Sequence, residues 1–471
     1  MDRLFEAVDV IDTVGDPGAT DITSIEFDDT AVTPGALFFC LPGHHRDGHD
    51  FAPSAVDRGA VGLLVERALP VPVVQQVVEA GTARHAMALV ARAFYGDPAG
   101  ALTTVGVTGT NGKTSVTRFV AGVLDAAGRR CDVIGTLDGP RTTPEAPVLH
   151  GLLAADRDDG FSAVALEVSS HALAESRVDG IVFDVAAFTN LSHDHLDYHH
   201  TMEEYFEAKA SLFAPERARV GVVNADDEWG RRIIERGAVE LRPYSMSEVG
   251  EVSTDATGTS FTWRGRHMRL GLAGRFHVAN ALCAAAVAEV LEVPLDAVEE
   301  AFASMAPVPG RFQVVPEAAP FTVVVDYAHT PDALAEALRS SRAASASGRV
   351  LVVFGCGGDR DRAKRPAMGT VAAAGAEVVV VTSDNSRGED PAAIIDEVVG
   401  GVGPGVELLV EPDRRSAIAA AVEQAEPGDV VLVAGKGHER TISAGGTDRP
   451  FDDVEEAAGA VRARRDKAVR R

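Results

Sequence analysis

Four apolar, valine-rich runs follow one another in the last third of the chain, and a helical pattern follows each of them. They are FTVVVDYAH at 321–329, RVLVVFGCGG at 349–358, AEVVVVTSDNSR at 376–387 and DVVLVAGKGHE at 429–439. Nearly continuous apolar strands that alternate with helices are typical of a parallel sheet covered by helices on both faces. We therefore expect an α/β protein whose last third contains such a sheet.

A second pattern begins near residue 104, where a short apolar run leads into a glycine-rich loop. Apolar side chains in the segment 114–128 then recur at the spacing i, i+3, i+4, i+7 and i+8, which places them on one face of a helix. These positions are Val116, Phe119, Val120, Val123 and Leu124, and Gly128 is the expected end of the helix. The segment predicts a strand, a loop and a helix in succession.

The first hundred residues hold two strand-like runs, at 36–43 and 60–66, with the polar segment GHHRDGHD between them. Two seams interrupt the chain, GDPAGALTT at 96–104 and the proline-rich SMAPVPGRFQ at 304–313. A length of 471 residues also suggests about three domains. We expect domains at 1–99, 100–308 and 309–471.

Charge excludes two classes of partner. The chain has 44 Lys and Arg against 70 Asp and Glu, which gives a formal net charge of −26. Because nucleic acids and anionic membranes bind basic surfaces, we expect neither a nucleic-acid partner nor docking on a membrane. A content of 46% hydrophobic and 24% charged residues fits a folded protein with a substantial core and argues against disorder.

Neither a secretory signal nor a membrane span is expected. The first twenty residues have no basic region that leads into an apolar stretch. No apolar run approaches the roughly 18 residues of a spanning helix. The four cysteines are scattered, without C-x-x-C or metal-ligand spacing, which indicates structural thiols in a reducing compartment. We expect a cytoplasmic protein.

The segment GVTGTNGKT at 106–114 is the strongest local signal for chemistry. A glycine-rich loop between a strand and a helix directs backbone N–H groups and the positive helix end at phosphate groups. In that arrangement Lys113 reaches the β- and γ-phosphate oxygens and Thr114 holds Mg²⁺. The strict G-x-x-x-x-G-K-[ST] pattern is not met, since Val107 stands where the first glycine is required. We expect a variant loop that binds ATP.

Two features suggest a second metal position. An apolar strand ends at Glu167, and a carboxylate at the carboxyl end of a strand suits a second Mg²⁺. The segment TNLSHDHLDYHH then brings four histidines into eight residues, His193, His195, His199 and His200. These could form a zinc site, but no cysteines or H-E-x-x-H helix accompany them. One histidine in contact with Mg²⁺ is the preferred interpretation.

A lysine lies on the apolar face of the helix expected at 201–213. Its apolar positions are Tyr205, Phe206, Leu212 and Phe213, and Lys209 falls among them. The lysine could pack its stem on that face and keep its ammonium in water. Alternatively it is buried, which lowers its pKa toward the neutral amine. A neutral amine can react with CO₂ to give a carbamate, which is an anionic metal ligand.

In the last third, each predicted strand ends in a polar group, and ligands of open α/β sheets bind at these carboxyl ends. The groups begin at Asp326, Gly357, Asp384 and Gly435. Any one of them could be a capped turn, but four in succession favour a binding site. Arg360 and Arg387 are suited to carboxylates and Glu439 to an ammonium group, so the expected ligand is an amino acid.

Seven motifs occur in a fixed order between about residue 20 and about residue 453. They are G-x-T-G-T-N-G-K-T, E-V-S-S-H, T-N-L-S-x-D-H-L-D-Y-H, A-K-x-x-L-F, D-Y-A-H-T-P, G-C-G-G-D-R-D and G-K-G-H-E. In these motifs the chain closely resembles the Mur ligases and, within them, the MurE type. The resemblance implies a UDP-binding N-terminal domain, a central ATPase domain with a P-loop-type parallel sheet, and a Rossmann-like C-terminal domain.

The resemblance also implies an activity. Ligases of this type add the third amino acid to UDP-N-acetylmuramoyl-L-alanyl-D-glutamate in peptidoglycan synthesis. ATP converts the substrate carboxylate to an acyl phosphate, the incoming amine attacks it, and a tetrahedral intermediate collapses to an amide and phosphate. Intact Lys113, Glu167, His195 and Lys209 favour such an enzyme over a non-catalytic nucleotide or UDP-sugar sensor. We expect ATP and Mg²⁺ as cofactors and a monomer.

Matched position by position, the resemblance implies four groups of site residues. The loop Gly109, Thr110, Asn111, Gly112, Lys113 and Thr114, with Asn280, Arg311 and Asp326, binds the nucleotide. Thr114, Glu167, His195 and the carbamylated Lys209 serve the metal ions. Asp29, His44, His45, Arg46, Thr142, Thr143, Ser169, Glu175 and Arg177 bind the UDP-muramoyl dipeptide. Arg360, Asp384, Asn385, Ser386, Arg387, Gly435 and Glu439 bind the added amino acid.

The sequence departs from the family pattern at several of these positions. The usual D-N-P-R loop reads D-N-S-R, which keeps Arg387 for a distal carboxylate, so meso-diaminopimelate is favoured over L-lysine. Losing the proline frees one φ angle. Asp29, Glu175 and His277 replace the usual Ser, Gln and Asn. A related ligase that adds L-lysine, or one that acts on another UDP-sugar or on a folate, is therefore the alternative.

Overall fold

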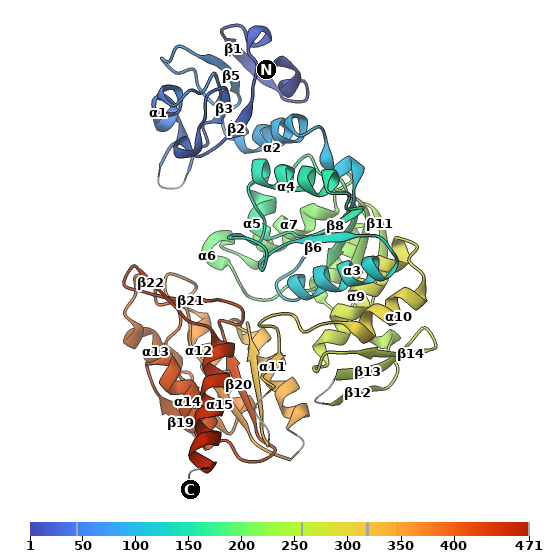
Figure 1. The fold of residues 1–471 in the computed structure, drawn as a ribbon, viewed down its shortest axis with the longest axis vertical. Coiled ribbons are helices and arrows are strands. Elements are labelled where there is room, and N and C mark those ends of the chain that lie inside the picture. Colours follow the sequence, from blue (N-terminus) through green and yellow to red (C-terminus); the bar gives the residue numbers. More distant parts are fainter. Residues whose placement is uncertain (44–45, 256–257, 317–319, 346, 470–471) are drawn as a thin grey trace.

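The structure is a computed structural model that describes residues 1–43, 46–255, 258–316, 320–345 and 347–469. Three domains follow one another along the longest axis of the molecule, and the two chain ends lie at opposite extremes (Figure 1). Each domain is built around its own sheet, with buried apolar residues on both faces of the sheet. In the described part of the chain, no helix is both long enough and apolar enough to cross a membrane.

The N-terminal sheet has the strand order β1-β5-β4-β3-β2. Its strands are β1 (Val10–Val14), β2 (Ser24–Glu26), β3 (Ala36–Phe39), β4 (Gly62–Val65) and β5 (Val74–Val78), and β1 alone pairs antiparallel. The helices are α1 (Ala52–Asp57) and α2 (Ala83–Phe94). The two strand-like runs of the sequence are β3 and β4. Helix α2 packs against α4 (Ala146–Asp158) and thereby joins this domain to the next.

The central sheet is parallel throughout, in the order β11-β10-β9-β6-β8-β7. Its strands are β6 (Thr103–Thr108), β7 (Cys131–Ile134), β8 (Ala163–Glu167), β9 (Phe183–Phe188), β10 (Ala218–Asn224) and β11 (Glu240–Tyr244). The remaining helices are α3 (Lys113–Ala126), α5 (Ser170–Ala174), α6 (Leu196–His199), α7 (Met202–Ala210), α8 (Glu228–Arg236), α9 (Phe276–Val290) and α10 (Leu295–Ser304). A separate antiparallel sheet comprises β12 (Val252–Asp255), β13 (Gly258–Trp263) and β14 (Arg266–Leu270).

The C-terminal sheet has the order β15-β16-β20-β17-β18-β19, and only the short β15 is antiparallel. The strands are β15 (Gln313–Val314), β16 (Thr322–Asp326), β17 (Val350–Phe354), β18 (Val378–Val381), β19 (Glu407–Val410) and β20 (Val430–Ala434), and β21 (Thr441–Ala444) and β22 (Thr447–Pro450) form a hairpin. The helices are α11 (Pro331–Ala344), α12 (Lys364–Gly375), α13 (Pro391–Val399), α14 (Arg414–Gln424) and α15 (Asp453–Val469). The parallel sheet expected from the four valine-rich runs is confirmed.

Parallel topology determines where the polar strand ends meet. Strands β16, β20, β17 and β18 are neighbours, so the four polar groups that follow them lie at one edge of the C-terminal sheet. In the central sheet β9, β6 and β8 are neighbours. The glycine-rich loop, Glu167 and the histidine-rich segment 189–200 therefore also share one edge.

A buried ion pair fixes the last helix to the C-terminal domain. The guanidinium of Arg414 donates to both carboxylate oxygens of Asp453, at 2.8 and 2.7 Å, and its side chain and that of Asp453 are almost fully buried. Removing one partner leaves a buried charge without its counter-charge.

We expect Asp453→Asn to lower the free energy of unfolding of this domain by about 3–5 kcal/mol. Thermal and urea unfolding of the full chain, each followed by two independent spectroscopic signals, would measure this loss. The matched control is Glu423→Gln, because Glu423 pairs with Lys467 between exposed side chains, and such a pair contributes only about 0–1 kcal/mol. Equal effects of the two substitutions would contradict the prediction.

Candidate active site at the domain junction

The glycine-rich loop closes tightly between β6 and α3. Gly109 and Gly112 have φ angles of 147° and 90°, a region that disfavours other residues. A Cβ at Gly109 would collide with Oγ1 of Thr189, and a Cβ at Gly112 would lie 2.5 Å from Oδ1 of Asn280. Both glycines are therefore required by the close approach of neighbouring segments, and Asn280 lies beside the loop.

The segment after β9 braces this loop. Oδ1 of Asn190 accepts the N–H of Asn111 at 2.9 Å, and its Nδ2 donates to the carbonyl of Asn111 at 3.1 Å. Thr189 donates its hydroxyl to the same carbonyl at 2.6 Å, and Thr110 donates its N–H to the carbonyl of Asn190 at 2.8 Å. The conformation of the glycine-rich loop 109–112, which we call the phosphate loop, thus depends on residues about 80 positions further along the chain.

Two lysines converge on one carbonyl of the loop. Lys113 donates to the carbonyl oxygens of Gly109 and Thr110, both at 2.9 Å. Lys209 donates to the same Gly109 oxygen at 2.8 Å, from a side chain that is 1% exposed. The burial of Lys209 predicted from the helical pattern is confirmed, and the alternative of an ammonium that reaches water is wrong.

The surroundings of Lys209 favour the neutral amine. Burial holds the pKa of Lys209 well below its ordinary value, and the positive charge of Lys113 acts in the same direction. The ring of Tyr205 lies against the amine, with its centroid 4.7 Å from Nζ. The Tyr205 hydroxyl and Oγ1 of Thr110 share a hydrogen bond at 3.1 Å, which ties α7 to the phosphate loop.

Glu167 ends β8 inside the same site, with 1% of its surface exposed. Its carboxylate accepts the N–H of Thr136 at 2.9 Å and the Thr136 hydroxyl at 3.1 Å. Thr136 also bonds to Oγ1 of Thr142 at 3.0 Å. Thr136 therefore bonds both to Glu167, a predicted metal ligand, and to Thr142, a predicted substrate residue. The sequence had not singled out Thr136.

In the histidine-rich segment, Asp194 lies between two histidines at the junction of the central and C-terminal domains. His195, at φ 54°, lies 3.5 Å from Oδ2 of Asp194, and His329 of the C-terminal domain lies 3.7 Å from the same oxygen. Burial alone would raise the pKa of Asp194, but His329 and His195 hold it well below its ordinary value. Burial lowers the pKa of His195 to about 3, and the nearby His171 acts in the same direction, whereas Asp194 opposes the shift.

Among the described residues, no three His, Cys, Asp or Glu side chains come together in a way that could hold a metal ion. Two of the four histidines considered for a zinc site have polar partners in different domains. His199 bonds through Nε2 to the Ser170 hydroxyl at 2.8 Å, whereas His193 lies 3.3 Å from Asp361 of the C-terminal domain.

The predicted nucleotide residues of the C-terminal domain lie near its boundary with the central domain. Arg311 donates to Oγ1 of Thr114 at 3.1 Å, and its guanidinium lies 4.3 Å from the ring centroid of Tyr327. Asp326 accepts the N–H groups of Phe312 and Ala328 at 2.7 and 2.8 Å. Burial raises the pKa of Asp326, while Arg311 opposes that shift. Arg311 thus connects the phosphate loop to the end of β16.

Four of the residues predicted to bind the muramoyl dipeptide lie around the end of β8. Thr143 donates its hydroxyl to the carbonyl of Glu167 at 2.7 Å and accepts the N–H of Ser169 at 3.1 Å. Arg177 donates to the carbonyl of Thr143 at 3.1 Å. The structure therefore brings Thr142, Thr143, Ser169 and Arg177 together beside Glu167.

Glu175, an acidic departure from the family pattern, is paired with cations. Arg177 donates to its carboxylate at 2.5 Å, and Arg84 of the N-terminal domain lies 4.0 Å away. Burial would raise the pKa of Glu175, but Arg177 and Arg84 keep it below its ordinary value. Because its charge is balanced, Glu175 does not place a free carboxylate against an anionic substrate.

The predicted residues of the N-terminal domain form a separate group. Asp29 accepts a hydrogen bond from the Ser54 hydroxyl at 2.7 Å, within that domain. Arg46, within the polar segment GHHRDGHD, is exposed. His44 and His45 lie outside the described residues. The described contacts do not bring Asp29 or Arg46 to the phosphate loop.

The predicted amino-acid site is assembled at the edge of the C-terminal sheet. Asn385 donates from Nδ2 to Oε2 of Glu439 at 2.7 Å and from its N–H to Asp384 at 2.5 Å. Gly435, at φ 113°, approaches Asp384 so closely that a Cβ would lie 2.8 Å from Oδ2. Arg387 donates to the carbonyl of Gly358 at 2.7 Å. Residues from three strand ends therefore form one cluster.

The D-N-S-R loop is held by the β21–β22 hairpin. Arg387 donates its N–H to the carbonyl of Ser443 at 3.1 Å, and Gly445 donates to the carbonyl of Arg387 at 2.9 Å. Ser386 is 2% exposed, and its carbonyl accepts the N–H of Glu389 at 2.9 Å. These backbone bonds restrain the loop where the family pattern has a proline.

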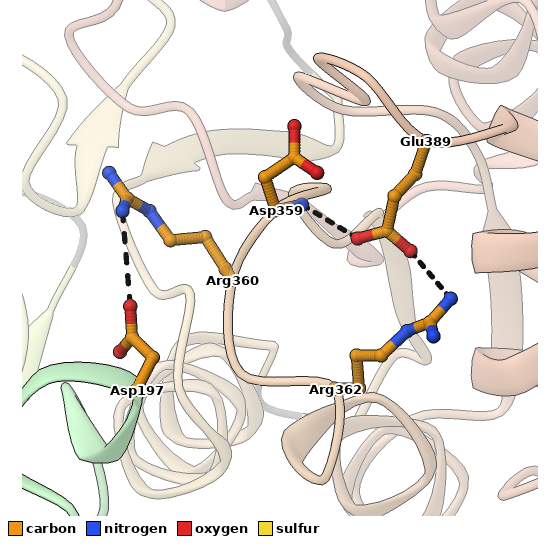
Figure 2. Close-up of a pocket in the computed structure, with 5 residues that line it drawn as sticks. All are labelled: Asp197, Asp359, Arg360, Arg362 and Glu389. Atoms are coloured by element: carbon orange, nitrogen blue, oxygen red, sulfur yellow. Dashed lines mark hydrogen bonds and ion pairs between the residues drawn. The ribbon is translucent and has the colours of Figure 1, made fainter. Parts of the chain in front are cut away.

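A pocket of about 370 Å³ lies between the central and C-terminal domains (Figure 2). Its lining residues are Asp197, Asp359, Arg360, Arg362 and Glu389. Arg360 points across the junction to Asp197, 4.0 Å away, whereas Arg362 points to Glu389 at 2.8 Å (Figure 2). The guanidinium of Arg360 is 56% exposed, so it is available to a ligand at this junction.

Several polar residues of the site were missed by sequence reasoning. They are Thr136, Asp194, Tyr205, His329 and Lys436; His329 contacts Asp194, and each of the other four contacts a residue that had been predicted. Asp194, His329 and Lys436 lie within the quoted motifs, which was the only signal available. Their contacts join segments that are far apart in the chain.

Known proteins match almost the whole chain. Family models for the Mur ligase family, catalytic domain, the Mur ligase middle domain, and the Mur ligase, glutamate ligase domain match residues 21–105, 107–288 and 310–437. The UDP-N-acetylmuramoyl-L-alanyl-D-glutamate--2,6-diaminopimelate ligase of Geobacillus thermodenitrificans is 44% identical, and the alignment covers 95% of this chain and 96% of the relative.

Solved structures agree with this assignment. A structure of UDP-N-acetylmuramoyl-L-alanyl-D-glutamate--2,6-diaminopimelate ligase is 33% identical with a TM-score of 0.67, over 94% of this chain and 95% of that one. MurF ligase from Thermotoga maritima in complex with ADP shares the fold at 20% identity, with a TM-score of 0.66 over 95% and 99% of the two chains. The three-domain α/β fold is confirmed, and the chain belongs to the Mur ligase family.

Proposed function

We propose that this chain is an ATP-dependent ligase of the MurE type, which joins meso-diaminopimelate to UDP-N-acetylmuramoyl-L-alanyl-D-glutamate in peptidoglycan precursor synthesis. The observation that carries the proposal is the 44% identity, over nearly the full length of both chains, to a relative whose name states these substrates. The site supports it, because contacts between Arg311 and Thr114 and between Arg360 and Asp197 join the phosphate loop and the amino-acid cluster at one junction.

The first step transfers the γ-phosphoryl group of ATP to the substrate carboxylate. The loop 109–112 and the start of α3 direct N–H groups and the positive helix end at the phosphates. Lys113 adds a positive charge where negative charge gathers on the transferred group. The products of this step are ADP and an acyl phosphate, whose C–O–P linkage activates the carbonyl carbon.

Mg²⁺ fits the donors that surround this step. Thr114 offers a hydroxyl, Glu167 offers a buried carboxylate, and the lowered pKa of His195 leaves a neutral imidazole. A carbamate on Lys209 would add a second anion to this set. Bound there, Mg²⁺ would supply positive charge that neutralises the phosphate oxygens.

The carbamate forms when the neutral amine of Lys209 attacks CO₂. A C–N bond forms, and the nitrogen loses one proton. Burial and the nearby Lys113 favour the neutral amine that this step requires. We propose that the carbamate is the functional state of Lys209.

The second step forms the amide. The amine of the added amino acid attacks the acyl carbon, and the tetrahedral intermediate expels phosphate with the electron pair of the C–O bond, while the nitrogen loses a proton. Arg387 and Arg360 are suited to bind carboxylates, and Glu439 is suited to an ammonium group. Meso-diaminopimelate carries both groups beyond its reacting centre, whereas L-lysine lacks the distal carboxylate.

The proposal is tested by phosphate release with ATP, Mg²⁺ and UDP-N-acetylmuramoyl-L-alanyl-D-glutamate against four amino acids. We expect turnover with meso-diaminopimelate and a product of the corresponding mass. We expect LL-diaminopimelate, L-lysine and L-ornithine to react about 100-fold less well or worse, since each lacks a correctly placed carboxylate. Preferred use of L-lysine, or no ligation with any of the four, would contradict the proposal.

Three further expectations remain predictions. They are the domain boundaries at 99/100 and 308/309, a cytoplasmic location and a monomeric state. The roles of Asp29, His44, His45 and Arg46 in binding the UDP-sugar also remain predictions.

A further inference from the structure

A buried lysine lies behind the amino-acid cluster. Lys436 follows β20, and its side chain has no exposed surface. Its ammonium donates to Oδ1 of Asn385 at 3.0 Å and to Oε2 of Glu439 at 2.9 Å, and it lies 3.9 Å from Asp384. Because Lys436 is fully buried, any effect on a ligand passes through these neighbours.

Lys436 fixes which way the amide of Asn385 faces. Oδ1 of Asn385 accepts two hydrogen bonds, from Lys436 and from the N–H of Ser443 at 2.9 Å. An amide has one acceptor end and one donor end, so these two donors hold Nδ2 on the opposite side. One N–H of Nδ2 goes to Glu439; no described residue accepts the second, which leaves it for a ligand acceptor such as a carboxylate.

The same contacts make the two carboxylate oxygens of Glu439 different. Oε2 accepts from both Lys436 and Asn385. Within the described part of the chain, Oε1 has no hydrogen-bond donor, and the Glu439 side chain is 30% exposed. Oε1 is therefore the oxygen left to accept from an ammonium group of a ligand.

We propose that Lys436 is a positioning residue for the added amino acid: it holds Asn385 as a donor to a carboxylate and reserves Oε1 of Glu439 for the second ammonium group of diaminopimelate. This inference rests on the proposed function, since it assigns the recognition of that substrate. Lys436 would act on specificity and would leave the nucleotide site unchanged.

The test compares two substrates in the full-length enzyme. 2-Aminopimelate has both carboxylates of diaminopimelate and one reactive amine, but it lacks the second amine. For Lys436→Met we expect kcat/KM to fall about 100-fold with meso-diaminopimelate and about 10-fold with 2-aminopimelate, because the charge-assisted contact to the second amine is lost. The preference for meso-diaminopimelate thus falls about 10-fold. The KM for ATP should change less than about twofold, as it should in the control Lys467→Ala, whose side chain is 64% exposed.

A purely structural role gives a different result. If Lys436→Met lowers kcat/KM for both substrates by the same factor, or changes kcat/KM for neither, the inference is wrong. Lys436→Gln serves as a second variant if the methionine protein does not fold, and the same loss of preference is expected because its shorter neutral side chain cannot reproduce the two contacts. Failure of the wild-type enzyme to use meso-diaminopimelate would instead overturn the proposed function.

Discussion

Replacing Lys209 with alanine is expected to lower the rate of ligation by about 1,000-fold, the effect of removing a group that stabilises charge in the reacting complex. Lys209 lies against the phosphate loop through Gly109 and against the ring of Tyr205, in a buried position where the neutral amine is favoured. Under the proposal, carbamylation would turn this amine into an anion beside Gly109 of the phosphate loop. The alanine variant would lack this proposed metal ligand and the bond to Gly109, while the bonds from Asn190 and Thr189 would still hold the loop.

A small carboxylate should partly restore the Lys209→Ala variant. Bicarbonate or acetate can occupy the space of the missing side chain and present oxygens where the carbamate would lie. Phosphate release, measured with and without each salt at constant ionic strength, gives the rescue directly. Lys467→Ala is the matched control, because its side chain is exposed on α15, and it should respond to neither salt. Full activity of Lys209→Ala without any added anion would refute the carbamate.

The features that the sequence predicts well are local or periodic. The phosphate loop and α3 follow from nine consecutive residues and one apolar helical face, and the buried Lys209 follows from the spacing of its apolar neighbours. The cluster at the C-terminal sheet edge was also predictable, because parallel strands place their carboxyl ends together. In each case the information lies within one segment or in a rule that relates successive strands.

The features that sequence reasoning missed depend on contacts between distant segments. Asp194 meets His329 only because two domains are apposed, and no periodicity relates positions 135 residues apart. In the sequence nothing distinguishes Lys436 from its neighbours in the loop, and only the structure shows its contact with Asn385. The edge strands β15 and β19 were not predicted, because β15 is only two residues long and all four residues of β19 are exposed, so neither has the buried apolar pattern of β16, β17, β18 and β20.

Replacing Arg387 with alanine is expected to lower kcat/KM for meso-diaminopimelate by about 100-fold or more, the usual effect of losing one partner of a charge pair that a bound ligand would shield from water. Arg387 adopts φ 51°, and its backbone bonds to the β21 hairpin at Ser443 and Gly445 hold it in that position. Its guanidinium lies over Gly357 and Gly358 at the end of β17, where a Cβ on Gly357 would come within 2.9 Å of it. The loop therefore presents a fixed cation at the edge where the distal carboxylate is expected.

The discriminating measurement is the preference between meso-diaminopimelate and L-lysine. L-Lysine has no distal carboxylate, so Arg387→Ala should change its weak turnover by less than about threefold, and the preference should collapse. Arg387→Lys should retain only part of the preference, because an ammonium cannot make the two parallel bonds of a guanidinium. Arg339→Ala, at an exposed position on α11, is the matched control. Equal losses with both amino acids, or an equal rise in the KM for ATP, would show that Arg387 supports the fold of the site instead of reading the carboxylate.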